Sequence, residues 1–529
     1  MSFEQSKTPV FLQSKAYYLL LLSFAYVIYS HWQSLNGGFL SDTYSIYIYC
    51  YNLDEKGELW NTIFSQFWHG MVNGGIDVYR PLGYLSICGE FHLFGNSPFV
   101  LRSIQLAFHL LNALMLFVLI KTIFKANKNA DITAAFAAVF FLFSPVSPEI
   151  SMWIATRHDS LALFFMLLAV LLHWQNKKLL SLISMILAYS SKESAIVLPA
   201  MLFSVSYFKI PFIFKNFKNK FILALKETWM YWLVFLIYLL ARFYMFGGAF
   251  HVYEARSASF GSFVHNLSVF PRVFSQLTLA AWSKSSIVPW FWTVFLFLVI
   301  YSCWISYKNK KTHLWVMFFS WILITLLALV TQVGSTDSSG AGSRILYTLS
   351  AWCAVLVSLP LLFMNRKTLS VALGYSILLI YIQALPLQNW TQAAVVSKKL
   401  LSSVKKLPPL ENNKQWSLVL TPDHIGVGLL ARTAQGGFSL PPFRSRYMLD
   451  EMVPFVETDL EIWRLRLVNK FMLEYKKNSK KPNQYPTHYY CTQKDGNLIE
   501  LQIDEIDASS KEKWQKKWKQ QTDKLGCYF

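Results

Sequence analysis

The chain has 529 residues, of which 54% are hydrophobic, 17% aromatic and only 15% charged. Soluble globular proteins carry about 25% charged residues, so this composition excludes a soluble enzyme and a disordered chain. The formal net charge of +20 does not indicate a nucleic-acid partner, because Lys and Arg fall in short runs between long apolar stretches. Such runs are typical of a polytopic membrane protein. The six cysteines show no CxxC spacing, which excludes a cysteine-built metal site.

Eleven apolar segments are candidates for membrane spans, each of which takes about 20 residues. The stretch 179–208 is broken by Lys192 and Glu193 and has basic residues on both flanks. It predicts two short helices that cross twice, since one helix would be too long for the bilayer core. The predicted spans are 16–32, 98–120, 132–148, 151–174, 179–191, 194–208, 228–246, 288–306, 314–333, 345–364 and 368–386.

This pattern predicts a mainly α-helical fold with the N-terminus in the cytoplasm and the C-terminus outside, because the inner loops are then the basic ones. Residues 1–390 are expected to form a transmembrane domain. Its two long external loops are 33–97 and 247–287, the second with an amphipathic helix near 262–280. Residues 391–529 are expected to form a small, soluble, mixed α/β domain outside.

The expected C-terminal domain has strand-like runs at Ser417–Leu420 and Leu498–Ile503, followed by a Lys-rich helix over 511–521. Cys491 and Cys527 both fall in this external domain, where disulfides form. A disulfide between them and two free thiols are equally compatible with the sequence.

A cluster of ionisable residues interrupts the apolar pattern at 147–159, and charge inside a span is usually functional. A helix that begins at Ser147-Pro148 would place Glu149, Trp153 and Arg157 on one face. Arg157 and Asp159 must then face a cavity or pair internally. The alternative to a functional role is a buried pair of Arg157 with Asp159 or Glu149 that only joins helices. Lys192 and Glu193 pose the same choice between an internal ion pair and a role at a substrate.

Four cations fall on the predicted external side, namely Arg80, Arg157, Lys192 and Arg344. If they converge, they suit a phosphate or pyrophosphate, because guanidinium forks match phosphate oxygens. Asp42 follows the first span closely, and an acid held near the membrane can act as a base for a hydroxyl acceptor. The other acids of the first loop, Glu90 among them, are expected to be solvated.

Four blocks resemble the GT-C class of integral-membrane glycosyltransferases, in particular the tetratricopeptide-bearing transmembrane O-mannosyltransferases and their bacterial relatives. Their order and spacing match over roughly residues 16–390. The blocks are YRPLGYLSICGEFHLFGNSPFVLRSIQLAFHLLN at 79–112, FSPVSPEISMWIATRHDSLALFF at 143–165, SKESAIVLP at 191–199 and SRILYTLS at 343–350.

The resemblance implies inverting transfer of a sugar from a polyprenyl-phosphate donor, on the external face, with Asp42 as the base. The four cations would bind the donor phosphate. Thr43 stands where many relatives have a second acid, so metal dependence stays open, and His158 stands where relatives often have a small residue. Further residues are expected to support the acceptor or to pair with the cations: Glu149, Asp159, Glu193, Tyr79, His109 and Tyr347.

Two other functions stay open on the sequence: a flippase for a lipid-linked sugar, and a polysaccharide ligase or polymerase that uses a pyrophosphate-linked donor. The expected partners are the lipid-linked donor, membrane lipid and a glycan, lipid or protein acceptor, with no nucleic acid. The tail lacks tetratricopeptide repeats, which favours a bacterial inner membrane with a periplasmic tail. Sequons at Asn266 and Asn389 keep the endoplasmic reticulum as the alternative.

Overall fold

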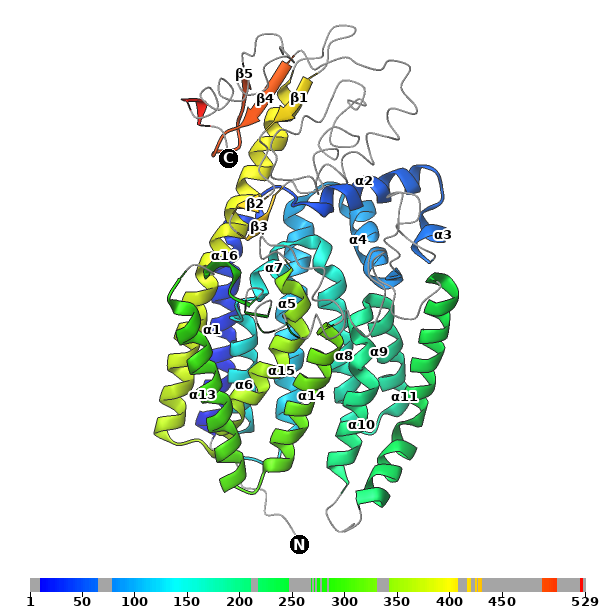
Figure 1. Cartoon of the computed structure of the whole chain (residues 1–529), viewed down its shortest axis with the longest axis vertical. Helices are drawn as coiled ribbons and strands as arrows, with labels where there is room; N and C mark the ends of the chain where they lie inside the picture. Colours follow the sequence, from blue (N-terminus) through cyan, green and yellow to red (C-terminus); the bar gives the residue numbers. More distant parts are fainter. Residues whose placement is uncertain are drawn as a thin grey trace. The chain divides into compact units, whose positions relative to one another are not determined.

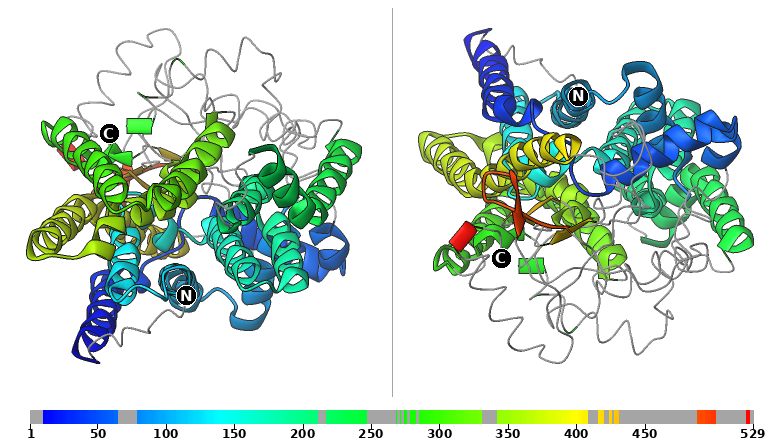
Figure 2. Two further views of the ribbon diagram at one scale, coloured as in Figure 1. Left: turned by 90° about the horizontal axis from the view of Figure 1, so that it is seen from below. Right: turned by 90° about the horizontal axis from the view of Figure 1, so that it is seen from above.

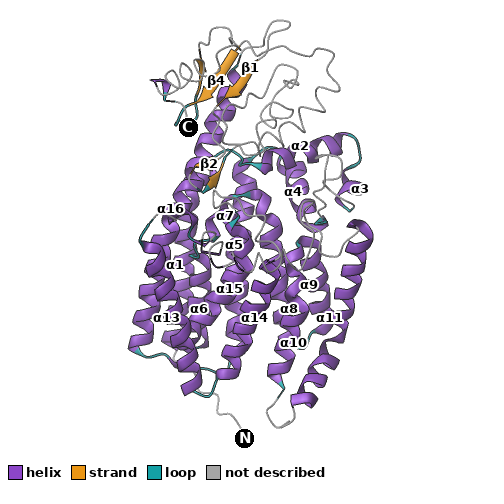
Figure 3. Ribbon diagram, in the orientation of Figure 1, coloured by secondary structure: helices purple, strands orange, loops and turns teal. Residues whose placement is uncertain are grey.

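The computed structural model describes most of the membrane part of the chain and short pieces of the tail. The described residues are 10–64, 79–210, 217–246, 287–330, 342–407, 416–419, 424–425, 427–430, 488–501 and 524–526, with isolated positions between 268 and 286. The protein is a mainly α-helical, polytopic membrane protein, as predicted. Its described strands all lie beyond residue 415 (Figure 3).

Seven helical segments of the described residues are long and apolar enough to cross a membrane. They are Pro98–Ile123, Ile154–Trp174, Lys218–Met245, Ile287–Lys308, Thr312–Leu329, Ser343–Phe363 and Arg366–Lys406. Two shorter apolar helices are Ala130–Leu142 and Lys178–Ser191. Each of the eleven predicted spans overlaps at least one described helix, whereas the number of crossings stays a prediction.

The helices are labelled in chain order in Figure 1. The α-helices are α1 (Val10–Leu35), α2 (Asp42–Glu55), α3 (Leu59–Ile63), α4 (Pro81–Phe94), α5 (Pro98–Ile123), α6 (Ala130–Leu142), α7 (Ser147–Met152), α8 (Arg157–Trp174), α9 (Lys178–Ser191), α10 (Leu198–Lys209), α11 (Phe217–Phe246), α13 (Ile287–Lys308), α14 (Thr312–Val330), α15 (Tyr347–Ser358) and α16 (Arg366–Lys406). Short 3-10 turns are η1 (Ile154–Thr156), η2 (Glu193–Val197), η3 (Ala280–Trp282), η5 (Ser343–Leu346) and η6 (Leu359–Phe363).

The chain divides into two compact units. The first comprises residues 1–32, 60–90 and 100–388, and the second comprises 33–59, 91–99 and 389–529. The predicted division at 390 stays a prediction, but the compact unit that contains the tail also contains two parts of the first external loop.

The first unit is a bundle in which neighbours along the chain often pack together. α8 packs on α9, α10 on α11, and α15 on both α6 and α14 (Figures 1 and 2). Trp321 and Trp352 are fully buried, and their rings meet edge to face with centroids 5.0 Å apart.

Among the described residues of the second unit there are five short strands: β1 (Trp416–Val419), β2 (His424–Ile425), β3 (Gly428–Leu429), β4 (His488–Thr492) and β5 (Leu498–Leu501). β4 is central, with β1 parallel on one side and β5 antiparallel on the other, and β2 pairs antiparallel with β3. The two predicted strands are confirmed as β1 and β5. The predicted helices at 262–280 and 511–521 lie outside the described residues, apart from isolated positions of the first.

Both charged clusters of the sequence coincide with helix breaks. The predicted break within 179–208 is confirmed, because Lys192 is extended, with φ −161° and ψ 145°, between α9 and η2. The predicted helix through 147–159 is wrong, because Trp153 is also extended and ends α7. The carbonyl of Ile150 accepts hydrogen bonds from the Gln105 side chain at 2.6 Å and from the Thr156 hydroxyl at 3.1 Å. These side chains take the place of the next helical N–H and favour the break.

α16 continues beyond the predicted end of its span, through Pro386 to Lys406. A proline inside a helix leaves the carbonyl four residues earlier without its N–H donor. Here that carbonyl belongs to Ile382, and the indole Nε1 of Trp282 donates to it at 2.8 Å. The indole thus satisfies the acceptor that the proline leaves, and the helix continues.

We expect Trp282→Phe to lower the free energy of unfolding by about 1 kcal/mol, since a buried acceptor loses its donor. Thermal unfolding in detergent measures the loss. The loss should shrink when Pro386→Ala supplies the missing N–H, and Trp290→Phe is the control, because that tryptophan is 70% exposed. Equal losses with and without Pro386 would contradict this explanation.

Candidate functional site

Several charged residues of the first unit form ion pairs. The first of these pairs lies at the start of α4. The Nε of Arg80 donates to Oε2 of Glu193 at 2.9 Å, and its Nη2 donates to Oε1 at 2.5 Å. The side chains are only 12% and 10% exposed. This two-pronged contact, the strong geometry for a guanidinium and a carboxylate, joins the start of α4 to the break after α9.

Arg157, the first residue of α8, has a fully buried side chain. It forms an ion pair with Glu90 of α4 and donates to the Ser86 hydroxyl at 2.9 Å and to Oε1 of Gln105 at 2.6 Å. The Phe108 ring lies 5.1 Å from the guanidinium carbon. An anion could reach this guanidinium only by displacing these partners.

Lys192 forms an ion pair with Asp159, and their side chains are 6% and 9% exposed. Asp159 lies two residues after Arg157 in α8, and Lys192 directly precedes Glu193. The three pairs therefore form one connected set, which joins α4, α8 and the break between α9 and η2.

These pairs correct three sequence-based expectations. Arg157 pairs with neither Asp159 nor Glu149, because the break at Trp153 and the two-residue spacing turn those carboxylates elsewhere. Lys192 and Glu193 do not pair with each other, because adjacent side chains on an extended backbone point to opposite sides.

Glu90 was expected to be solvated, but it is only 8% exposed and pairs with Arg157. Its second oxygen, Oε2, is buried without a hydrogen-bond partner. The missed signal is the helical spacing of Gly83, Ile87 and Glu90, which puts all three on one buried face of α4.

A further ion pair joins α7 to η5. The Nη1 of Arg344 donates to Oε1 of Glu149 at 2.8 Å, and the ring of Trp153 lies 4.8 Å from the guanidinium carbon. Oε2 of Glu149 also accepts from the Ser343 hydroxyl at 2.6 Å and from the N–H groups of Gly342 and Arg344, each at 3.3 Å. The Arg344 side chain is 30% exposed, whereas that of Glu149 is only 2% exposed.

An uncharged network joins α5, α8 and α15. The His109 Nδ1 lies 2.9 Å from the Tyr347 hydroxyl. The Asn112 side chain donates to that hydroxyl at 3.3 Å and to the carbonyl of Ser160 at 2.9 Å. All of these side chains are buried. The hydrogen bond at 2.9 Å brings the two predicted residues His109 and Tyr347 into contact with each other.

The four sequence blocks are thus tied together. Block 79–112 contacts 143–165 through Arg157, contacts 191–199 through Arg80 and contacts 343–350 through His109. Block 143–165 contacts 191–199 through Lys192 and contacts 343–350 through Arg344. The polar residues that interrupt the apolar pattern therefore belong to connected networks within one unit.

His158 sits between two of these paired residues in the chain and is 3% exposed. Its Nδ1 is buried without a hydrogen-bond partner. Its ring packs edge to face on Tyr84, with centroids 4.6 Å apart, and a Cβ on Gly83 would lie 1.8 Å from Nδ1. Only glycine at position 83 therefore leaves room for this imidazole against α4.

Asp42 belongs to the second unit and is the first residue of α2. It is half-buried, and the Ser41 hydroxyl lies 3.3 Å from its Oδ1. Ser41 has φ 44°, and the N–H of Ser41 donates to the Leu430 carbonyl at 2.9 Å. A positive φ at a residue other than glycine costs of order 1–3 kcal/mol and is concentrated at functional sites. Asp54, Glu55 and Glu58 are exposed, as expected.

Tyr79, which was expected to support the acceptor or to pair with a cation, is half-buried just before α4.

Cys491 is disulfide-bonded, but Cys527 lies outside the described residues, so their pairing stays open. Cys50 and Cys88 are also disulfide-bonded, and Cys303 and Cys353 are free. Where side chains are described, no cluster of three or more His, Cys, Asp or Glu residues could hold a metal.

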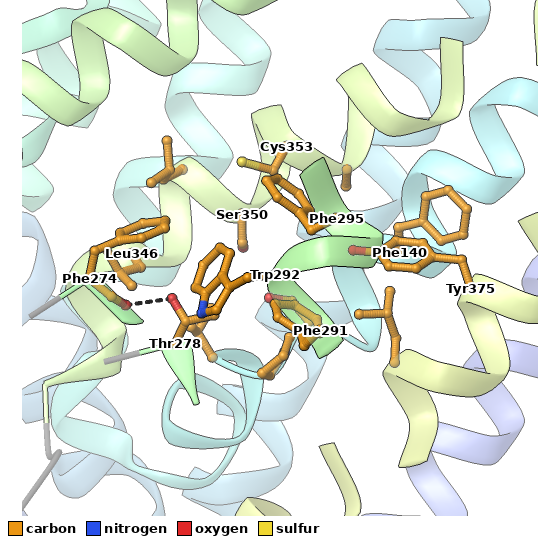
Figure 4. Close-up of a pocket in the computed structure, with 16 residues that line it drawn as sticks. Phe140, Phe274, Thr278, Phe291, Trp292, Phe295, Leu346, Ser350, Cys353 and Tyr375 are labelled. Atoms are coloured by element: carbon orange, nitrogen blue, oxygen red, sulfur yellow. Dashed lines mark hydrogen bonds between the residues drawn. The ribbon is translucent and has the colours of Figure 1, made fainter. Parts of the chain in front are cut away.

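An apolar pocket lies elsewhere in the first unit, lined by α6, α13, α15 and α16 and by residues 274 and 278. Its walls are mostly apolar, and the aromatic side chains of Phe291, Trp292 and Tyr375 are among them (Figure 4). The Thr278 hydroxyl donates to the carbonyl of Phe274 at 2.8 Å and is thereby satisfied. None of the predicted site residues lines this pocket, which suits an apolar group.

No family model matches the chain, and no curated protein matches it. Among solved structures, the chain is similar to that titled "Crystal Structure of ArnT from Cupriavidus metallidurans in the apo state", at 14% identity and a TM-score of 0.32. The likeness covers 86% of this chain and 88% of that chain.

We expect Gly83→Ala to lower the free energy of unfolding by about 1–3 kcal/mol, because the new methyl group overlaps His158. Gly89→Ala on the same helix is the matched control, since a Cβ there meets nothing within 4 Å and alanine favours the helix. Thermal unfolding in detergent compares the two variants. His158→Ala should restore much of the stability of Gly83→Ala, and a failure to do so would place the clash elsewhere.

Proposed function

We propose that the protein is a GT-C-class glycosyltransferase that moves a sugar from a polyprenyl-phosphate donor to a hydroxyl acceptor. The observation that carries the proposal is the set of buried ion pairs that joins the four sequence blocks. Burying an ion pair costs desolvation free energy, and apolar residues would join the helices as well. Eight charged groups retained in one membrane unit therefore favour a role with a charged ligand.

The cations differ in how readily each could turn to a donor phosphate. Arg344 is the most exposed of the four, and its carboxylate partner Glu149 has three other hydrogen-bond donors. Glu149 would therefore stay satisfied if the guanidinium moved to a phosphate. We assign Arg344 as the first phosphate ligand for this reason.

Arg80 and Lys192 are the next candidates, because their side chains are 12% and 6% exposed, whereas that of Arg157 is fully buried. Lys192 lies at the break between α9 and η2, and Arg80 contacts this break through Glu193. Arg157 is fully buried, so it supports the phosphate site by fixing α8 against α4. Glu149, Asp159 and Glu193 hold the cations in place before the donor binds.

In the proposed reaction, the acceptor hydroxyl oxygen attacks the anomeric carbon while the bond from that carbon to the phosphate oxygen breaks. The acceptor proton passes to Asp42, and the phosphate leaves with the bonding electron pair. The sugar passes through an oxocarbenium-like state, and attack opposite the leaving group inverts the anomeric centre. The cations stabilise the charge that develops on the leaving phosphate.

The cysteines support an external face for this chemistry. Those that are disulfide-bonded lie in α2, α4 and β4, within segments predicted to be external. The free Cys303 and Cys353 lie in predicted spans. Because disulfides persist in oxidising compartments, we propose the periplasmic side of a bacterial inner membrane.

A flippase for the same lipid-linked sugar is the second candidate, because transporters bind substrates at interrupted helices. Among the described residues, Trp153 and Lys192 both interrupt helices in this way, whereas the sequence indicated only the break at Lys192. Purified protein in detergent has no second compartment into which it could transport a lipid. If the protein consumes the donor under these conditions, it is not only a flippase.

We expect Asp42→Asn to lower transfer by a factor of roughly 100 or more, since a base contributes about 10²–10⁴-fold. The assay measures polyprenyl phosphate released from monophosphate-linked sugars in the presence of candidate acceptors. Asp54→Asn is the matched control, because Asp54 lies in the same helix and makes only an exposed pair with His92. Unchanged transfer by Asp42→Asn would remove Asp42 as the base. Release only from pyrophosphate-linked donors would favour the ligase.

We expect Arg344→Gln to raise the KM for the donor by about 10–100-fold, because a hydrogen bond to a charged group contributes about 1.5–3 kcal/mol. The same release assay measures KM and kcat. Arg366→Gln, at the exposed start of α16, is the control. A normal donor KM in Arg344→Gln would show that another cation holds the phosphate.

A further inference from the structure

The loop that leads to Asp42 lies directly against the last turns of α16, within the second unit. A Cβ on Gly37 would lie 2.5 Å from the Cβ of Ala394, and a Cβ on Gly38 would lie 2.5 Å from the backbone nitrogen of Lys398. Positions 37 and 38 therefore accept only glycine without a shift of the helix backbone.

Hydrogen bonds fix this contact along the loop. The N–H of Gly38 donates to the Ala394 carbonyl at 2.7 Å. The Ser397 hydroxyl donates to the carbonyl of Phe39, and it lies 3.0 Å from the hydroxyl of Tyr44. Ser397 is fully buried. It thus contacts the chain on both sides of Asp42.

The tail makes two more contacts around this point. The Leu430 carbonyl accepts the N–H of Ser41, the residue with positive φ directly before Asp42. The turn between β4 and β5 rests on the same part of α16, because a Cβ on Gly496 would lie 2.7 Å from the Val396 carbonyl oxygen. The loop before Asp42 and the turn between β4 and β5 therefore contact the same short stretch of α16, and Leu430 contacts the loop at Ser41.

We propose that the C-terminal tail is a positioning element for Asp42, with Gly38, Ser397 and the Leu430 carbonyl as its positioning groups. This inference rests on the proposed function, in which Asp42 is the base. The strained backbone of Ser41 needs contacts that hold it, and these contacts come from Ala394, Ser397 and Leu430. The tail thereby belongs to the catalytic machinery, in addition to any part it takes in acceptor choice.

Ser397→Ala in the full-length protein tests the proposal, with Ser402→Ala as the matched control on the same helix. Ser402 is exposed. We expect Ser397→Ala to lower kcat for transfer about tenfold to a hundredfold while the KM for the donor stays unchanged, because small displacements of a reacting group have effects of about this size. Ser402→Ala should match the wild type.

Tyr44→Phe is a second variant, which removes one of the same hydrogen bonds without opening a cavity in α16. It should lower kcat in the same way but less than Ser397→Ala. If Ser397→Ala does not fold, this variant together with Gly38→Ala carries the test.

A double mutant separates positioning of Asp42 from general damage. If Ser397 acts through Asp42, Ser397→Ala should have no further effect on the residual rate of Asp42→Asn. A further drop, or wild-type kcat in both Ser397→Ala and Tyr44→Phe, would overturn the inference. A wild-type protein that releases no polyprenyl phosphate from any donor would instead overturn the proposed function.

Discussion

The membrane unit depends on the pairing of buried charges. An unpaired ion in an apolar interior is unfavourable, and in the four ion pairs described above each cation meets a carboxylate. α8 alone supplies Arg157 to Glu90 and Asp159 to Lys192, and so it joins α4 to the break after α9. The helix breaks at Trp153 and Lys192 lie beside these charges. The ion pairs and the helix breaks therefore depend on each other, because the paired side chains meet only if the helices are interrupted at Trp153 and Lys192.

The same pairing explains how the unit could be stable without a ligand and still receive one. Four cations and four carboxylates leave the paired groups with no net charge. In the proposed function, the donor phosphate adds negative charge where Arg344 is exposed and where Glu149 keeps other donors. The deeply buried Arg157 has no comparable freedom. The proposed function thus divides ligand binding and helix positioning between similar side chains.

In the second unit, the contacts around Asp42 are of a different kind from the ion pairs of the first unit. These contacts are mainly backbone and hydroxyl hydrogen bonds together with close glycine packing, as at Gly38 and Ser397. α16 takes part in both units, because its first half packs in the membrane bundle and residues 389–406 support the loop before α2. The indole of Trp282 lets this helix continue through Pro386. A single continuous helix thus carries the chain from the bundle to the support of the proposed base.

The sequence by itself determined the membrane class, the positions of the apolar helices and the break at Lys192, because hydropathy and charge act locally along the chain. It also singled out Arg80, Arg157, Lys192, Arg344 and Asp42. Only the tertiary structure decided the pairing, since the partner of a buried charge is set by which helix faces meet. Glu90 shows this most clearly, because nothing near it in the chain indicates Arg157, 67 residues away. The break at Trp153 and the support of Asp42 by α16 likewise depend on side chains and backbone distant in sequence, which no local pattern contains.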